Sequence, residues 1–231
     1  MSPALPATDD EERFAAARQR MVEHQLRARG IRDERVLTAM GRVPRERFVG
    51  DRWRRRAYDD GALPIGYGQT ISQPWVVAAI CQGLELSGSE QVLEVGTGSG
   101  YSAAVLSLLA AEVVSVERVP ELAASAAERL RELGFTNVAV IAGDASGGLP
   151  DREPFAAVAV HASAPILPPG LVSQLATGGR LVIPIAERGA DLLTVFRRPE
   201  AGAELASEVI GPCRFVPLIG REGFAPDDGW G

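Results

Sequence analysis

Short apolar runs alternate with amphipathic segments through the central part of the chain. Runs such as 113–117 and 156–160 are apolar at nearly every position, which is typical of strands buried on both faces. Strands of this kind, separated by helical segments, predict a parallel sheet covered by helices on each side. We expect strands at 91–95, 113–117, 138–142, 156–160 and 180–185, and helices at 101–110, 120–133 and 168–176. Two late segments, 192–196 and 206–210, are expected to add antiparallel strands.

The part of the chain before the sheet has a helical pattern instead. Apolar residues recur at helical spacing over 9–29, and Gly30 marks the end of this helix. Asp33 is expected to begin a second, short helix. Residues 59–73 are polar and rich in glycine, and a loop of this length in a compact domain is usually functional. Pro74 suits the first turn of the helix that follows it.

These elements predict one α/β domain over 1–231, because the chain is long for one domain but short for two. Its expected parts are N-terminal helices at 9–60, a substrate and cofactor loop with its helix at 61–84, a Rossmann-like core at 85–224 and a loose tail at 225–231. The sheet is expected to be doubly wound and mostly parallel.

Composition narrows the possible functions. The net charge of −6 makes non-specific nucleic-acid binding a poor prospect. No apolar run reaches membrane-spanning length and the N-terminus has no signal pattern, so we expect a cytoplasmic protein without membrane contact. We also expect a monomer. Cys81 and Cys213 lack metal-ligand spacing, so we expect two reduced thiols and no metal site.

Positive charge is concentrated near the N-terminus. Residues 1–60 hold 14 arginines against 11 acidic residues, whereas 61–231 hold 10 against 19. Four arginines cluster in this first part: Arg52, Arg54, Arg55 and Arg56. The favoured interpretation is a solvated face, and the alternative is a patch that attracts an anionic substrate.

A glycine-rich turn follows the first expected strand. Gly96, Gly98 and Gly100 permit a tight turn and a close approach of the backbone to a ligand. Parallel sheets bind ligands at the carboxyl ends of their strands. The dinucleotide fingerprint requires a glycine where this chain has Tyr101, which weakens a dehydrogenase interpretation.

Acidic residues lie in or after three successive strands. Glu117 ends the second strand, 21 residues after Gly96, and can accept hydrogen bonds from ribose hydroxyls. Asp144 follows the third strand and can accept from an adenine amino group. Glu94 lies inside an apolar strand and needs a partner, either a ligand ammonium or the amides of the turn. A ribose, an adenine and an amino-acid head together indicate S-adenosylmethionine.

Several motifs extend this interpretation to a family. They are Met21–Leu26, Val43–Val49, Leu63–Pro74, the turn at 96–100, Gly178–Pro184 and Arg214–Gly220. With them the chain resembles the protein-L-isoaspartate O-methyltransferases from Met21 to Phe224. The loop through Gln69, Thr70, Ile71 and Ser72 makes the match specific, since the glycine turn alone indicates only a methyltransferase.

The resemblance implies a fold, a reaction and a site. The fold is a Rossmann-like, seven-stranded sheet with an antiparallel last strand and extra N-terminal helices. The reaction transfers a methyl group from S-adenosyl-L-methionine to the free carboxylate of an L-isoaspartyl residue, leaving S-adenosyl-L-homocysteine and starting repair through a succinimide. Ser72 takes the catalytic role, and the cofactor contacts are Gln69, Thr70, Ile71, Ser72, Glu94, Gly96, Gly98, Gly100, Glu117, Asp144 and Ala145. Candidates for the substrate pocket are Ile65, Tyr67, His161, Ala162 and Val216.

Three positions depart from the family pattern. Ala145 replaces a glycine, Ala156 an aspartate, and His161 a threonine or glycine. An isoaspartyl carboxylate is ionised at neutral pH and needs no general base, so catalysis is expected to rest on positioning and desolvation. His161 as a base would instead suit a hydroxyl or amine acceptor. Two alternatives therefore stay open, a carboxyl methyltransferase for an aspartate in a dedicated peptide partner and a cofactor-binding protein without turnover. For Ser72 a helix N-cap is the competing, structural role.

Overall fold

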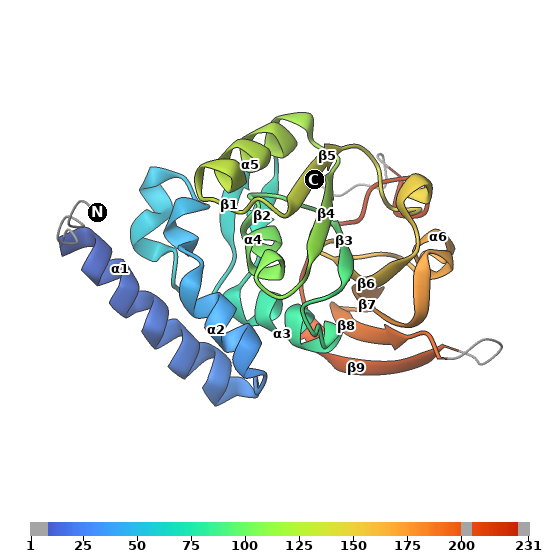
Figure 1. Ribbon diagram of the computed structural model, residues 1–231, viewed down its shortest axis with the longest axis horizontal. Coiled ribbons are helices and arrows are strands. Elements are labelled where there is room, and N and C mark those ends of the chain that lie inside the picture. The colour runs from blue at the N-terminus through green and yellow to red at the C-terminus, as the bar shows by residue number, and fades with distance from the viewer. Residues whose placement is uncertain (1–8, 200–204, 226–231) are drawn as a thin grey trace.

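The computed structural model describes residues 9–199 and 205–225 (Figure 1). The helical elements are α1 (Asp9–Arg20), η1 (Met21–Leu26), η2 (Arg27–Arg29), α2 (Glu34–Arg42), η3 (Arg45–Arg47), η4 (Asp51–Arg56), α3 (Pro74–Leu84), α4 (Tyr101–Ser107), α5 (Pro120–Glu132), η5 (Pro150–Arg152) and α6 (Pro169–Ser173). The strands are β1 (Leu63–Gly66), β2 (Gln69–Ile71), β3 (Gln91–Val95), β4 (Glu112–Glu117), β5 (Val138–Ala142), β6 (Phe155–Val160), β7 (Leu175–Glu187), β8 (Ala190–Arg197) and β9 (Ala206–Cys213). The tail expected at 225–231 lies outside the described residues, apart from Ala225.

Seven strands form the central sheet in the order β5-β4-β3-β6-β7-β8-β9. The pairs from β5 to β7 are parallel, whereas β8 pairs antiparallel with β7 and β9 pairs antiparallel with β8. This arrangement confirms the expected Rossmann-like fold with an antiparallel last strand. The strand order reverses between β3 and β6, so their carboxyl ends open a crevice where ligands bind in such folds.

Side chains of the central strands alternate between two apolar layers. Val92 and Val113 face the layer that contains α3, α4 and the N-terminal helices. Leu93 and Val114 face the opposite layer, which includes Leu171 of α6. Both faces of the sheet are therefore buried, which is why the strands read as nearly continuous apolar runs.

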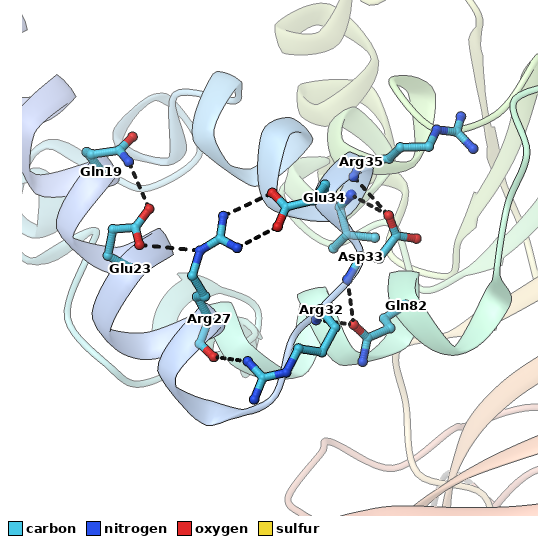
Figure 2. Close-up of polar contacts among 9 residues, drawn as sticks. Gln19, Glu23, Arg27, Arg32, Asp33, Glu34, Arg35 and Gln82 are labelled. Carbon is cyan, nitrogen blue, oxygen red and sulfur yellow. Dashed lines mark hydrogen bonds and ion pairs between the residues drawn. The ribbon is translucent and has the colours of Figure 1, made fainter.

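The N-terminal helices lie at one side of the sheet, with α1 outermost (Figure 1). Polar contacts fix the turn that joins them (Figure 2). The Asp33 carboxylate accepts a hydrogen bond of 2.8 Å from the Arg35 amide and caps α2, as the sequence predicts. The Gln82 side chain on α3 accepts 2.6 Å and 3.1 Å bonds from the amides of Arg32 and Asp33. The exposed Arg27–Glu34 pair adds little stability, so Gln82 is the stronger tie to the core.

Three local expectations need correction. Residues 59–73 contain the β1–β2 hairpin, whose tip holds Tyr67 at a φ of 53°. The helix expected at 168–176 ends at Ser173, and β7 begins at Leu175. A register shift in the β6–β7 ladder accounts for this, because the glycines at 178–179 lie inside the strand rather than before it. The long helix expected over 9–29 changes to a π-helical turn at Met21.

Candidate active site

A cavity of about 660 Å³ opens at the carboxyl ends of β3, β4, β5 and β6. Its size lies in the range of small-molecule sites. The β1–β2 hairpin lines one side, and the segment 215–219 after β9 lines another. The cavity thus lies where the strand order predicts a ligand.

The glycine turn forms the floor of this cavity. Gly96 and Gly98 line it, with φ values of 97° and 54°. A Cβ built at Gly96 would lie 3.4 Å from the Cβ of His161, so the turn has little room for a side chain. Gly100, at a φ of 89°, lies behind the turn, where a Cβ would meet Leu130 at 3.3 Å. Gly100 therefore shapes the turn and does not line the cavity.

Glu117 holds the turn from the neighbouring strand. Its Oε2 accepts a 2.8 Å hydrogen bond from the Gly98 amide, and its Oε1 accepts 2.9 Å from the Val119 amide. Each carboxylate oxygen keeps a further lone pair, and the residue lines the cavity. Glu117 can therefore accept from ribose hydroxyls while it supports the turn.

Asp144 joins the end of β5 to the C-terminal segment. Its carboxylate accepts from the amides of Ser146 at 2.8 Å and Arg221 at 2.9 Å. Partial burial opposes ionisation, but these backbone donors prevail and hold the pKa of Asp144 below its ordinary value. The Glu222 side chain accepts from the Gly170 amide at 2.7 Å, so the C-terminal segment is also tied to α6.

Glu94 is fully buried and does not line the cavity. The hydroxyls of Ser102 and Ser115 donate to its two oxygens, and the His161 Nε2 lies 3.4 Å from its Oε1. Burial raises the pKa of Glu94 to about 7, against the effect of both hydroxyls. Two serines therefore supply the partners for which the sequence suggested either a ligand ammonium or the turn amides, and Ser102 and His161 line the cavity where Glu94 does not.

Ser72 lies at the end of the hairpin, where α3 begins. The N-cap of α3 is Gln73, without a side-chain capping bond, so the capping role expected for Ser72 is wrong. Arg45, fully buried, donates from Nη2 to the Ser72 carbonyl at 2.7 Å and from Nε to the Ala57 carbonyl at 2.7 Å. Among the described residues nothing hydrogen-bonds to the Ser72 hydroxyl, which leaves it available to a ligand.

A second cavity of about 180 Å³ adjoins the first. It extends over Arg214 and Cys213 at the end of β9. The two cavities share five lining residues: Thr70, Ser72, His161, Phe215 and Val216. These five residues form a wall shared by the two cavities. A group that is transferred from a ligand in one cavity to a ligand in the other must cross the region that they line.

Most residues expected from the sequence meet at these cavities. The larger cavity is lined by Tyr67, Gln69, Thr70, Ile71, Ser72, Gly96, Gly98, Glu117, Asp144, Ala145, His161, Ala162 and Val216. Ile65, Glu94 and Gly100 lie outside both linings. Ile65 instead approaches Gly98, where a Cβ would lie 3.3 Å from its Cδ1.

Sequence analysis missed four residues that position the site. Arg45 holds the Ser72 backbone, Ser102 holds Glu94, and Arg221 reaches Asp144 through its amide. Asp191 accepts from the Ser163 hydroxyl at 2.7 Å and from the Phe215 amide at 2.8 Å, so it fixes the segment of the shared wall. Arg45 lies within the motif Val43–Val49, and Arg221 directly follows the motif Arg214–Gly220. These motifs were the signal in the sequence that could have indicated both residues.

No group of His, Cys, Asp and Glu residues within 9–199 and 205–225 has the geometry of a metal site. In the same ranges no helix is long and apolar enough to cross a bilayer.

The family model described as protein-L-isoaspartate(D-aspartate) O-methyltransferase matches residues 16–223. The chain belongs to this family. It is 51% identical to protein-L-isoaspartate O-methyltransferase 1 of Rhodopseudomonas palustris (strain HaA2), over 95% of this chain and 90% of the relative. The fold, enzyme class and cofactor expected from the sequence are thereby confirmed: the chain is an S-adenosylmethionine-dependent methyltransferase of isoaspartyl residues.

Solved structures agree with this assignment. One protein-L-isoaspartate O-methyltransferase superposes with a TM-score of 0.79 at 28% identity, covering 89% of this chain and 67% of the other. A putative protein-L-isoaspartate O-methyltransferase from Plasmodium falciparum, in complex with S-adenosyl-L-homocysteine, has a TM-score of 0.73 at 26% identity. It covers 87% of this chain and 98% of its own.

The residues present fit S-adenosylmethionine. The glycine turn leaves space that a Cβ would fill, and Glu117 offers carboxylate oxygens for hydroxyl groups. When bound, the cofactor supplies a methyl group activated by a positively charged sulfur. The reaction requires the isoaspartyl carboxylate, an anion, next to that methyl group. The cationic side chain of Arg214 lines the adjoining cavity.

Proposed function

We propose that the larger cavity holds S-adenosylmethionine and the smaller one the isoaspartyl carboxylate, with Ser72 between them. Both cavities are lined by Ser72, and this shared wall is the observation that carries the proposal. In this assignment the Ser72 hydroxyl donates to the acceptor carboxylate and aligns it. Arg214 supplies the positive charge that draws the carboxylate into the smaller cavity.

The residues act mainly by positioning and by excluding water. A carboxylate of pKa about 4 is already ionised at neutral pH, so no residue has to remove a proton. The Arg45 bond to the Ser72 carbonyl holds the hairpin end in place. Asp144 and Asp191 hold the C-terminal segments that close the other side. Bringing opposite charges together in a dry site lowers the barrier for in-line displacement.

We also propose the partners, location and domain organisation of the enzyme. The partners are proteins and peptides that contain isoaspartyl residues, and the enzyme acts as a cytoplasmic monomer without nucleic acid or membrane. The single domain over 1–231 carries the whole site. Ala145 stands in place of a glycine and Ala156 lies outside both linings, so neither residue removes a carboxylate from the cavities.

Methyl transfer from labelled S-adenosylmethionine to twin peptides, one with isoaspartate and one with aspartate, tests this function. We expect labelling of the isoaspartyl peptide alone. Ser72→Ala should lower kcat/KM about 10- to 100-fold, in line with the loss of a hydrogen bond to a charged group. Ser173→Ala on the remote α6 is the matched control. Labelling of neither peptide would move the assignment to a dedicated peptide partner or to a protein without turnover.

A further inference from the structure

His161 is the buried residue on the shared wall for which the proposed reaction has no role. It follows β6 directly, and its side chain is 6% exposed. Its Nε2 lies 2.9 Å from the Ser102 Oγ, and the same hydroxyl donates to Glu94. A continuous chain of hydrogen bonds therefore connects buried Glu94 with a ring that lines both cavities.

Ser102 lies between Glu94 and His161 and has a single hydroxyl proton, which links the protonation state of Glu94 to the tautomer of His161. When Glu94 is ionised, Ser102 donates to it and can only accept from His161, which must then carry its proton on Nε2. When Glu94 is protonated, it donates to Ser102, which in turn donates to an unprotonated Nε2. The neutral ring then carries its proton on Nδ1. The charge of Glu94 thus selects the tautomer of His161.

We propose that Glu94, Ser102 and His161 form a relay through which the positive charge of bound S-adenosylmethionine fixes the tautomer of His161, making His161 a positioning residue for the acceptor. The relay rests on the proposed function. Positive charge in the larger cavity favours ionised Glu94, one residue layer behind the wall. The carboxyl proton passes to Ser102, the Ser102 proton passes to Nε2, and the Nδ1 proton leaves to solvent.

The groups around the relay favour a switch near neutral pH. Burial and, to a smaller extent, the charge of Glu117 on β4 raise the pKa of Glu94 to about 7, although the hydroxyls of Ser102 and Ser115 oppose this effect. Cys81 on α3 faces Glu94 as a protonated thiol, because burial raises its pKa strongly. Arg214 faces the smaller cavity, and burial lowers the pKa of His161 to about 4, so the ring stays neutral throughout. In the free enzyme both states of Glu94 are therefore accessible.

The tautomer matters because it decides what Nδ1 offers the acceptor. With the cofactor bound, Nδ1 presents a lone pair, and none of the described residues hydrogen-bonds to it. In isoaspartate the free carboxylate and a peptide N–H sit on the same carbon atom, whereas in aspartate the carboxylate lies one carbon further away. An acceptor beside the carboxylate subsite can therefore bind the isoaspartyl N–H and favour this substrate.

Nitrogen-15 NMR of histidine-labelled enzyme tests the relay directly. The chain has two histidines, His24 and His161, so a His24→Gln variant assigns the signals. At pH 6 we expect the Nδ1–H tautomer of His161 in the free enzyme, a switch to Nε2–H on adding S-adenosylmethionine, and release of roughly one proton per cofactor bound. At pH 8.5 the Nε2–H form should be present without cofactor, and little proton release should occur.

Further measurements distinguish a failure of the relay from a failure of the proposed function. Calorimetry in the same samples reports cofactor binding. Binding without any change of tautomer would overturn the relay and leave the proposed function intact, whereas no binding at all would overturn both. At a concentration of S-adenosylmethionine that calorimetry shows to saturate the variant, the His161 tautomer in Ser102→Ala should not change, and an unchanged switch would contradict the proposal. His161→Asn, which keeps an acceptor, should preserve the KM preference for isoaspartyl over aspartyl peptide better than His161→Leu does.

Discussion

The guanidinium of Arg45 and the backbone carbonyl of Ser72 are joined by a 2.7 Å hydrogen bond. The Arg45 side chain also lies over the Tyr101 ring, with its Cζ 4.7 Å from the ring centroid. Burial lowers the pKa of Arg45, and the phenol hydroxyl groups of Tyr101 and Tyr58 partly oppose that effect. One buried cation therefore holds the hairpin by its backbone and leaves the Ser72 hydroxyl free.

Replacing Arg45 should damage stability and the site together. In Arg45→Lys a single ammonium cannot keep both carbonyl bonds and the contact with Tyr101, so we expect about 2–4 kcal/mol of lost unfolding free energy. We also expect a lower kcat. Denaturant unfolding and peptide kinetics measure the two effects. Arg47→Lys, at an exposed position two residues away, is the control, and equal stability of both variants would contradict the prediction.

Glu117→Gln should weaken cofactor binding. Both Glu117 oxygens accept backbone N–H bonds, and an amide can supply one acceptor where two are needed. A loss of ~1.5–3 kcal/mol corresponds to an increase of about 10- to 150-fold in Kd for S-adenosylmethionine. Isothermal titration checks this, with Glu121→Gln on the exposed start of α5 as the control. A Kd within about twofold of the unaltered enzyme would show that the carboxylate is dispensable.

A comparison of Gly96→Ala with Gly134→Ala should separate the effect of backbone strain from the effect of a side chain beside the cavity. Alanine at a φ of 97° is strained, and its methyl would face His161 beside the cavity. Gly134 has a φ of 82° with no atom within 4 Å of a Cβ, so Gly134→Ala carries only the strain. Both variants should lose about 1–2 kcal/mol of stability. Only Gly96→Ala should also lose cofactor affinity, and equal affinities in binding assays would refute this.

Asp144 should contribute to stability in a pH-dependent way. Its pKa is lower in the folded state than the ordinary value of 3.8, so its contribution is complete above that value. The contribution disappears as the pH falls through the lower, folded pKa. Asp144→Asn should therefore be less stable at pH 7 and lose less stability on acidification below 3.8. Thermal unfolding across this range measures the difference, and parallel curves would contradict the prediction.

The sheet was predictable because its strands are apolar on both faces, and Glu117 and Asp144 were predictable because they follow such strands. The partner of Glu94 was not, since Ser115 becomes its neighbour only through the parallel register of β3 and β4. Ser102 meets Glu94 only after α4 packs on the sheet. Arg45 is surrounded in sequence by other charged residues, and no local pattern indicates that it is fully buried while Arg47 is exposed. Contacts that depend on long-range packing leave no periodic trace in the sequence.

The bond between Asp144 and the Arg221 amide has a consequence for synthesis of the enzyme. The cavity wall draws on residues as early as Tyr67 and as late as Ile219. A nascent chain contains β3 and its glycine turn long before the segment that Asp144 holds has been synthesised. The complete cavity therefore becomes available only after nearly the whole polypeptide has left the ribosome, because residues 215–219 line one side of it.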